Sequence, residues 1–296
     1  MSYRLPRNAT ALEQAIINEL KYRAVFNASL TYYQLWNSLF LLHPINESQQ
    51  KEFTLENFNK VLKKLKQSKY INRTTTGNYY IQTKKPFKWG HRANYAQEYL
   101  NSLGPVVKVL SHIGWIKLLA VSGSVAAYSA KKNDDVDLFI VTEKKRLWLT
   151  RLFVVLLLKT LRSYRTDKNS ANKICPNIFL DEGALTWPTE RQNIYVGHEI
   201  ILLRPLINRD NTYFKFLDAN SWIKGFFCTF CYASEKTYKS IYKPGSKLVD
   251  LLEDFVKMVQ LRYMKQKITS EIIQDRLLHF NKHDHTSKII NEFEKN

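Results

Sequence analysis

Cysteine and long apolar runs are both scarce in this sequence. The 296 residues include only three cysteines, too few for a disulfide framework: Cys175, Cys228 and Cys231. The longest apolar run, residues 152–158, is far shorter than the roughly 20 residues that a transmembrane helix needs. The first ten residues, MSYRLPRNAT, lack the apolar stretch of a secretory signal. We therefore expect a cytoplasmic protein without a membrane span.

Acidic residues are also few. The chain has 26 Asp and Glu against 45 Lys and Arg, a formal net charge of +19, and residues 1–96 alone carry 15 basic and 5 acidic side chains. A basic surface attracts polyanions, which makes nucleic acid, a nucleotide or an anionic membrane a candidate partner. A chain that uses lysine wherever its surface tolerates it would show the same excess.

Apolar and aromatic side chains, by contrast, are plentiful. They make up 45% and 13% of the chain, enough to bury a sizeable core and to exclude wholesale disorder. The length corresponds to about two domains of ordinary size. Changes in pattern divide the chain into three segments, residues 1–86, 87–190 and 191–296.

The first segment is predicted to fold as three helices followed by a hairpin. Apolar residues recur at helical spacing from residue 9 to 27, and Thr31 and Thr54 are suited to begin a second helix and a third over residues 55–67. Two short apolar runs then flank the turn TTTGN at residues 74–78. The third helix carries several lysines on its polar side.

This order of elements over residues 9–83 resembles the winged helix-turn-helix fold. In its DNA-binding members the third helix enters the major groove and the hairpin touches the backbone. The resemblance implies phosphate contacts from four basic residues: Lys60, Lys63, Lys64 and Arg73. Winged helices also dock proteins, so DNA or RNA binding and protein docking both remain open for residues 1–86.

The second segment carries a pattern of glycine, serine and aspartate at strand ends. An apolar strand over residues 115–121 leads into Ser122-Gly123-Ser124, and a second apolar strand begins with Asp135-Val136-Asp137. Because side chains alternate along a strand, Asp135 and Asp137 are expected on one face while Val136 enters the core. Residues 173–181 form a further strand candidate.

This pattern resembles the signature of the nucleotidyltransferase superfamily typified by DNA polymerase beta, over about residues 95–190. The resemblance implies an enzyme that moves a nucleoside monophosphate from a triphosphate (NTP) to an acceptor hydroxyl and releases pyrophosphate. Asp135 and Asp137 would hold two Mg²⁺ ions, which stabilise the attacking and leaving oxygens. Gly123 and Ser124 would receive the β- and γ-phosphates. The acceptor and the preferred base are left open.

Members of that superfamily usually add a third carboxylate from a later strand. Position and parity along the strand point to Asp181 as this metal ligand and catalytic base. Asn177 shares the predicted face and lies nearer the middle of the strand. If Asn177 is the equivalent residue, the metal site loses one negative charge and catalysis is in doubt.

The third segment is mostly helical by pattern. Together the segments predict an α+β protein with a winged helix in residues 1–86, a nucleotidyltransferase core with a small mixed sheet in 87–190, and a helical domain in 191–296. The expected partners are an NTP and, through the first segment, nucleic acid, but no membrane. The alternative is a DNA-binding regulator whose nucleotidyltransferase domain is inactive or only senses nucleotide.

Overall fold

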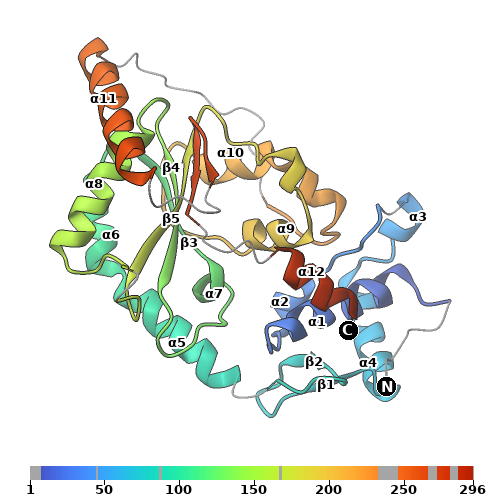
Figure 1. The fold of residues 1–296 in the computed structure, drawn as a ribbon. Helices are drawn as coiled ribbons and strands as arrows, with labels where there is room; N and C mark the ends of the chain where they lie inside the picture. Colours follow the sequence, from blue (N-terminus) through green and yellow to red (C-terminus); the bar gives the residue numbers. More distant parts are fainter. Residues whose placement is uncertain are drawn as a thin grey trace.

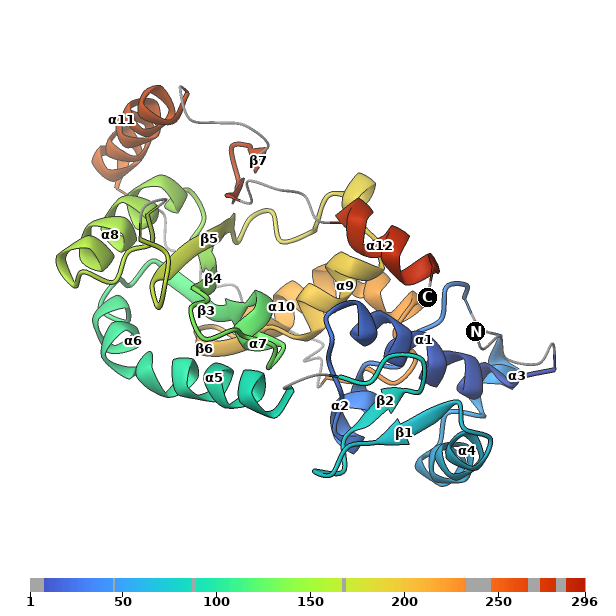
Figure 2. The same cartoon turned by 60° about the horizontal axis from the view of Figure 1, so that its bottom comes forward.

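The protein is a mixed α/β structure built around one six-stranded sheet (Figure 1). The computed structural model describes residues 8–44, 46–86, 89–166, 169–232, 246–265, 272–280 and 286–295. A separate two-stranded hairpin lies in the N-terminal part of the chain (Figure 2). Among the helices of the described residues, none is both long enough and apolar enough to cross a membrane.

The N-terminal part contains the predicted helices and hairpin. The elements are α1 (Ala11–Val25), α2 (Tyr32–Asn37), α3 (Glu47–Gln50), α4 (Leu55–Gln67), β1 (Ile71–Arg73) and β2 (Tyr79–Ile81). Thr10, Thr31 and Thr54 begin α1, α2 and α4 because each side chain accepts a hydrogen bond from the third backbone N–H of its helix. The short α3 was not predicted. Leu30 also pairs with Tyr79, which extends the hairpin by one bridge.

The central sheet has the order β6-β3-β4-β5-β8-β7. Its strands are β3 (Ile116–Ser122), β4 (Val136–Thr142), β5 (Ile174–Asp181), β6 (Arg204–Asn208), β7 (Ile272–Ile273) and β8 (Leu277–His279). Strands β4 and β5 run parallel, while the other neighbouring pairs are antiparallel. The sheet is therefore mixed, as predicted, and β3, β4 and β5 are the three strands that the sequence indicates.

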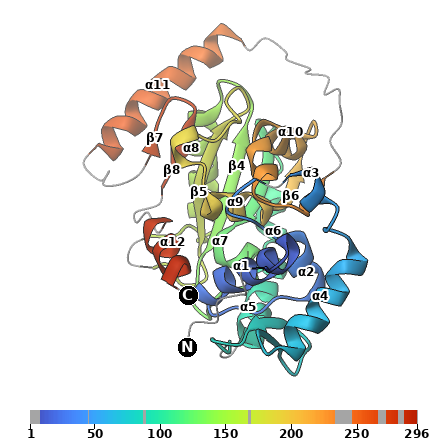
Figure 3. The same ribbon diagram turned by 90° about the vertical axis from the view of Figure 1, so that its right-hand side faces the viewer.

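Helices cover both faces of the sheet. One face packs on α5 (Trp89–Ser102), α6 (Gly104–Leu110), α7 (Gly123–Ala126) and α8 (Leu147–Thr160), with α11 (Lys247–Met264) outside α8. The other face packs on α9 (Ile194–Ile201), α10 (Thr212–Ala219), α12 (Thr286–Lys295) and part of α1. Short 3₁₀ turns occupy Thr189–Arg191 and Ser221–Gly225. Figure 1 shows the sheet between these layers, and Figure 3 shows α11 at the outer edge of the protein.

The prediction of a separate helical domain in residues 191–296 is wrong. Strands β6, β7 and β8 come from this segment and pair with both edges of the sheet begun by β3–β5. These strands have two to five residues, and β6 contains Pro205, which is tolerated because β6 is an edge strand. Strands this short show too little alternation to be recognised from sequence. The predicted helix at residues 248–264 is confirmed as α11.

A buried polar cluster joins the N-terminal helices to the rest of the protein. Glu19 of α1 forms an ion pair with Arg23 at 2.8 Å, and its other oxygen lies 2.8 Å from His198 Nε2 of α9. The Tyr22 ring stacks on the His198 ring at a centroid distance of 3.8 Å. Burial alone would raise the pKa of Glu19, but His198 and Arg23 outweigh it and lower the pKa. This contact sets the position of α1 against α9.

We expect Glu19→Gln to destabilise the protein by about 3 kcal/mol, because it leaves the buried Arg23 charge without its partner. Urea denaturation at pH 7 measures the change in the free energy of unfolding. The matched control is Glu56→Gln, which breaks the fully exposed pair of Glu56 with Lys60 and should leave the stability unchanged. Equal effects of the two substitutions would contradict the structural role given to the Glu19 cluster.

Candidate functional site

The register of β3 on β4 brings the two halves of the sequence pattern together. Ser122 at the end of β3 lies opposite Asp137 of β4. Gly123 follows with φ +64°, and a Cβ at this position would lie 2.8 Å from Asp137 Oδ2. Glycine is therefore required for the backbone conformation and for the space. The Gly-Ser bend and the aspartate strand meet as predicted.

Asp135 and Asp137 also lie together, as expected from their spacing. One possible ligand atom from each, and the Sγ of Cys175 on β5, all lie within 4.8 Å of one another. Cys175 reaches this cluster because it is in parallel register with Asp137. The cysteine was not among the predicted site residues, since the sequence alone does not set the register of β5.

The cluster places acidic groups close together in a half-buried setting. Burial is the largest cause that raises the pKa of Asp137 to about 7, and the charges of Asp135 and Glu199 raise it further. Arg165 opposes them and pairs with Asp135 at 2.9 Å. Burial also raises the pKa of the Cys175 thiol to about 12, so this group stays protonated at neutral pH.

Ser124 lies in the wall of the same cavity but has a partner within the protein. Its hydroxyl donates to Asp134 Oδ2 at 3.0 Å, and the backbone N–H of Lys131 donates to the same oxygen at 2.8 Å. These bonds close the loop between α7 and β4. Asp134 therefore has a structural role, and Ser124 would have to leave it to contact a phosphate.

Asp181 does not join the two aspartates, and its predicted position is wrong. It pairs with Thr142, five positions beyond Asp137 along β4, which corresponds to roughly 16 Å. Its carboxylate accepts hydrogen bonds from the backbone N–H groups of Lys145 and Gly183, both at 2.7 Å. Asp181 thus closes a loop at the opposite end of the strand.

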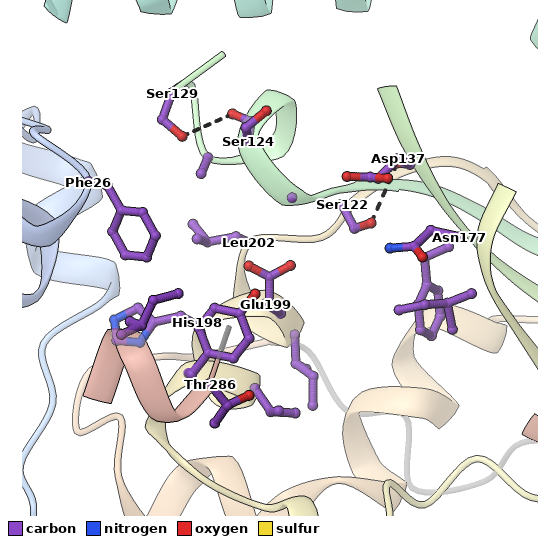
Figure 4. Close-up of a pocket in the computed structure, with 18 of the residues that line it drawn as sticks. Phe26, Ser122, Ser124, Ser129, Asp137, Asn177, His198, Glu199, Leu202 and Thr286 are labelled. Carbon is purple, nitrogen blue, oxygen red and sulfur yellow. Dashed lines mark hydrogen bonds between the residues drawn. The ribbon is translucent and has the colours of Figure 1, made fainter. Parts of the chain in front are cut away.

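Two features of β5 account for this error: Cys175 rather than Asp181 lies opposite Asp137, and a β-bulge occurs at Asn177. Pro176 pairs with Leu138 and Ile178 pairs with Phe139, so Asn177 is an extra residue in β5. A bulge reverses the alternation of side chains beyond it, which moves Asp181 to the other face of the sheet. Asn177 itself lines the cavity, with its amide directed toward the end of β4 (Figure 4).

A cavity of about 890 Å³ holds the predicted residues Gly123, Ser124, Asp135 and Asp137. Its walls come from α1, the sheet, α9 and α12. Basic and aromatic residues from several elements face it: Tyr22, Arg23, Phe26, Arg92, Arg165 and Lys288. The cavity therefore combines an acidic end with positive and aromatic side chains.

Glu199 of α9 is the main site residue that the sequence analysis missed. Figure 4 shows its carboxylate pointing into the cavity, toward the wall that carries Ser122 and Asp137. Burial raises its pKa, and the nearby backbone of Gly123 opposes this shift. The signal in the sequence is the adjacent pair His198-Glu199 inside an otherwise apolar helix.

The basic residues predicted to bind nucleic acid lie on α4 and β1, outside the cavity lining. Lys60 pairs with Glu56 at 2.6 Å and Lys64 pairs with Glu13 at 2.5 Å, while Lys63 is exposed. Arg73 donates to the Gly77 carbonyl and lies over the Tyr79 ring. These lysines share the solvent-exposed side of one helix.

Comparisons with known proteins give no family. No protein-family model, curated protein or solved structure matches the chain. The function must therefore be argued from the chemistry of the cavity.

We expect Asp137→Asn to stabilise the metal-free protein at pH 8 by about 4 kcal/mol and to have little effect at pH 4. The ordinary pKa of aspartate is 3.8 and the folded protein holds Asp137 at about 7. Between these values the unfolded chain binds fewer protons than the folded one, so wild-type stability falls as the pH rises. Urea denaturation across this range, in a chelating buffer, measures the difference.

The matched control is Asp181→Asn, which weakens two hydrogen bonds from backbone N–H groups. It should destabilise the protein at pH 8 rather than stabilise it. A destabilising effect of Asp137→Asn at pH 8 would contradict the electrostatic description of the site.

Proposed function

We propose that the protein is a divalent-cation-dependent nucleotidyltransferase that moves a nucleoside monophosphate from an NTP to an acceptor hydroxyl and releases pyrophosphate. The observation that carries the proposal is the contact between Gly123 and Asp137 in the wall of a large cavity. The bend at Gly123, where the backbone can approach a phosphate closely, therefore lies beside the carboxylates that would bind the cation. The cavity volume is within the range of small-molecule sites.

The residues at the acidic end fit a hard divalent cation such as Mg²⁺. Asp135 and Asp137 offer carboxylate oxygens, and Asn177 offers an amide oxygen nearby. The protonated thiol of Cys175 is an unsuitable ligand for such an ion. When bound, the cation would neutralise charge that develops on the transferring phosphoryl group. Arg165 now neutralises Asp135, and it is free to contact a phosphate once the carboxylate binds a cation.

Glu199 takes the place that the resemblance gave to Asp181. It enters from α9 rather than from β5, and its charge is close enough to raise the pKa of Asp137. Its raised pKa makes it a better proton acceptor than an ordinary carboxylate. We assign to Glu199 the removal of the proton from the attacking hydroxyl.

The remaining walls suit a nucleoside triphosphate. Arg92 and Lys288 supply positive charge for the phosphates, and Phe26, which follows α1, offers aromatic surface for a base. Part of this wall belongs to the N-terminal segment, which we interpret as a winged-helix-like domain. In this interpretation the N-terminal domain forms part of the substrate site. It can also bind nucleic acid or a protein through a separate surface.

The test is transfer of label from NTPs labelled at the α-phosphate to acceptors in a cell extract with added Mg²⁺. The cation is expected to stabilise the transition state by several kcal/mol. Asp135→Asn and Asp137→Asn should therefore each reduce the rate of transfer by about 100-fold or more. Glu199→Gln should lower transfer but keep Mn²⁺ binding. The control Asp181→Asn should transfer label at close to the wild-type rate.

Label transfer that persists in both aspartate variants would overturn the assignment. Loss of transfer in Asp181→Asn, with the fold intact by circular dichroism, would show that the third carboxylate is on β5 after all.

A second candidate is a DNA-binding regulator whose cavity only senses nucleotide. The exposed lysines of α4 beside the hairpin of β1 and β2 favour it. The neutral Asn177 also favours this candidate, because it lies on the strand that was expected to carry the third carboxylate. This candidate predicts salt-sensitive binding to duplex DNA that survives Asp137→Asn and is lost in a Lys60, Lys63 and Lys64 to Glu variant. Binding that is insensitive to salt would contradict it.

A further inference from the structure

Helix α11 packs against the protein through a side that carries Glu253 and Gln260 together with Val256, Leu261 and Met264. Glu253 and Gln260 are buried against α8, where the Glu253 carboxylate accepts from the backbone N–H groups of Trp148 and Leu149 at 2.7 and 2.9 Å. The Gln260 amide donates to the Trp148 carbonyl at 2.9 Å. Amphipathic helices in globular proteins normally bury their apolar side. In α11 most of the large apolar side chains lie instead on the side that faces away from α8.

These polar contacts are well suited to hold α11 in this orientation. Helix α8 begins at Arg146 without a hydrogen bond from a cap side chain, so its first N–H groups need acceptors from elsewhere. The carboxylate of Glu253 supplies them and adds a negative charge at a helix N-terminus. Arg146 also pairs with Asp250 of α11 at 2.7 Å. This packing therefore provides hydrogen-bond acceptors for the first backbone N–H groups of α8.

The apolar side of α11 consequently faces solvent. Seven large side chains on it are 46% to 67% exposed: Leu248, Leu251, Leu252, Phe255, Met258, Val259 and Tyr263. They recur at intervals of three and four residues, the spacing by which helices pack on one another. On the adjoining α8, Phe153, Leu156 and Leu161 are 41% to 50% exposed. Monomeric proteins rarely expose apolar patches of more than a few hundred Å².

We propose that this face of α11 is the interface of a homodimer, in which α11 packs antiparallel against α11 of a second copy. Seven half-exposed side chains present about 100 Å² each, which makes about 700 Å² per copy. Two copies would bury about 1,400 Å², which is within the range of stable interfaces. The exposed residues of α8 extend the same surface at its margin.

The charges of α11 favour this partner over a membrane surface. Helices that lie on anionic membranes are rich in Lys and Arg, whereas α11 carries three basic and three acidic residues. Of these six, Glu253 is buried against α8, Asp250 pairs with Arg146 and Lys257 pairs with Asp275, so α11 presents no run of basic residues to an anionic surface. A two-fold axis that crosses α11 gives an antiparallel pair in which both copies use the same face.

The test is the mass of the full-length chain in solution, measured by light scattering over a micromolar concentration series. We expect a dimer for the wild type. Leu251→Glu combined with Phe255→Glu should raise the dimer dissociation constant by at least about 100-fold, because it buries charge at the centre of the interface. Both side chains are exposed in the monomer, so the circular dichroism spectrum should be unchanged, and the thermal unfolding temperature should fall only by the stabilisation that dimerisation gives the wild type.

The matched control is Leu55→Glu combined with Tyr33→Glu, which changes two equally exposed side chains on other helices and should leave the dimer intact. A wild-type monomer would overturn the proposal, as would a dimer that survives the two α11 substitutions. A wild-type monomer that cosediments with vesicles of anionic phospholipid would assign the face to a membrane instead. The α11 residues are outside the cavity lining, so Mn²⁺ binding should be the same in all variants.

Discussion

The antiparallel pairing of β3 with β4 is the constraint on which the candidate site depends. It places the end of one strand beside the beginning of the next, so that Gly123 touches the Asp137 carboxylate. Any side chain at position 123 would push this carboxylate away, and a one-residue shift in register would turn Asp137 to the other face of the sheet. The result is a carboxyl group held at a pKa of about 7 by burial and by neighbouring charges. Groups with such perturbed pKa values cluster at functional sites.

The rest of the protein builds a cavity around this contact. The Glu19 cluster attaches the N-terminal helices to α9, and α9 in turn carries Glu199 into the cavity. Residues distant in the sequence therefore depend on one another: the position of α1 sets one wall, and the position of α9 sets the group opposite the aspartates. The C-terminal segment pairs with the sheet instead of forming a domain of its own, and its helices α9 and α12 line the cavity.

Much of the fold and half of the site follow from local sequence signals. Threonines mark the beginnings of α1, α2 and α4, and the alternation in residues 135–141 predicts that Asp135 and Asp137 lie together. Local sequence signals do not predict the position of Asp181. The parallel register of β5 on β4 places Asp181 five positions from Asp137, and one extra residue in β5 reverses its face; neither the register nor a bulge can be recognised reliably from the sequence. Glu199 could not be placed either, because its role depends on how α9 packs against the sheet.

The most direct test of the central claim is anomalous diffraction from crystals grown with Mn²⁺ and an NTP analogue that cannot be cleaved. The account predicts one strong manganese peak in contact with the carboxylates of Asp135 and Asp137, with the Arg165 guanidinium turned from Asp135 to the phosphates. A peak at Asp181, or the analogue bound with the Asp135–Arg165 pair intact and no metal beside Asp137, would contradict it.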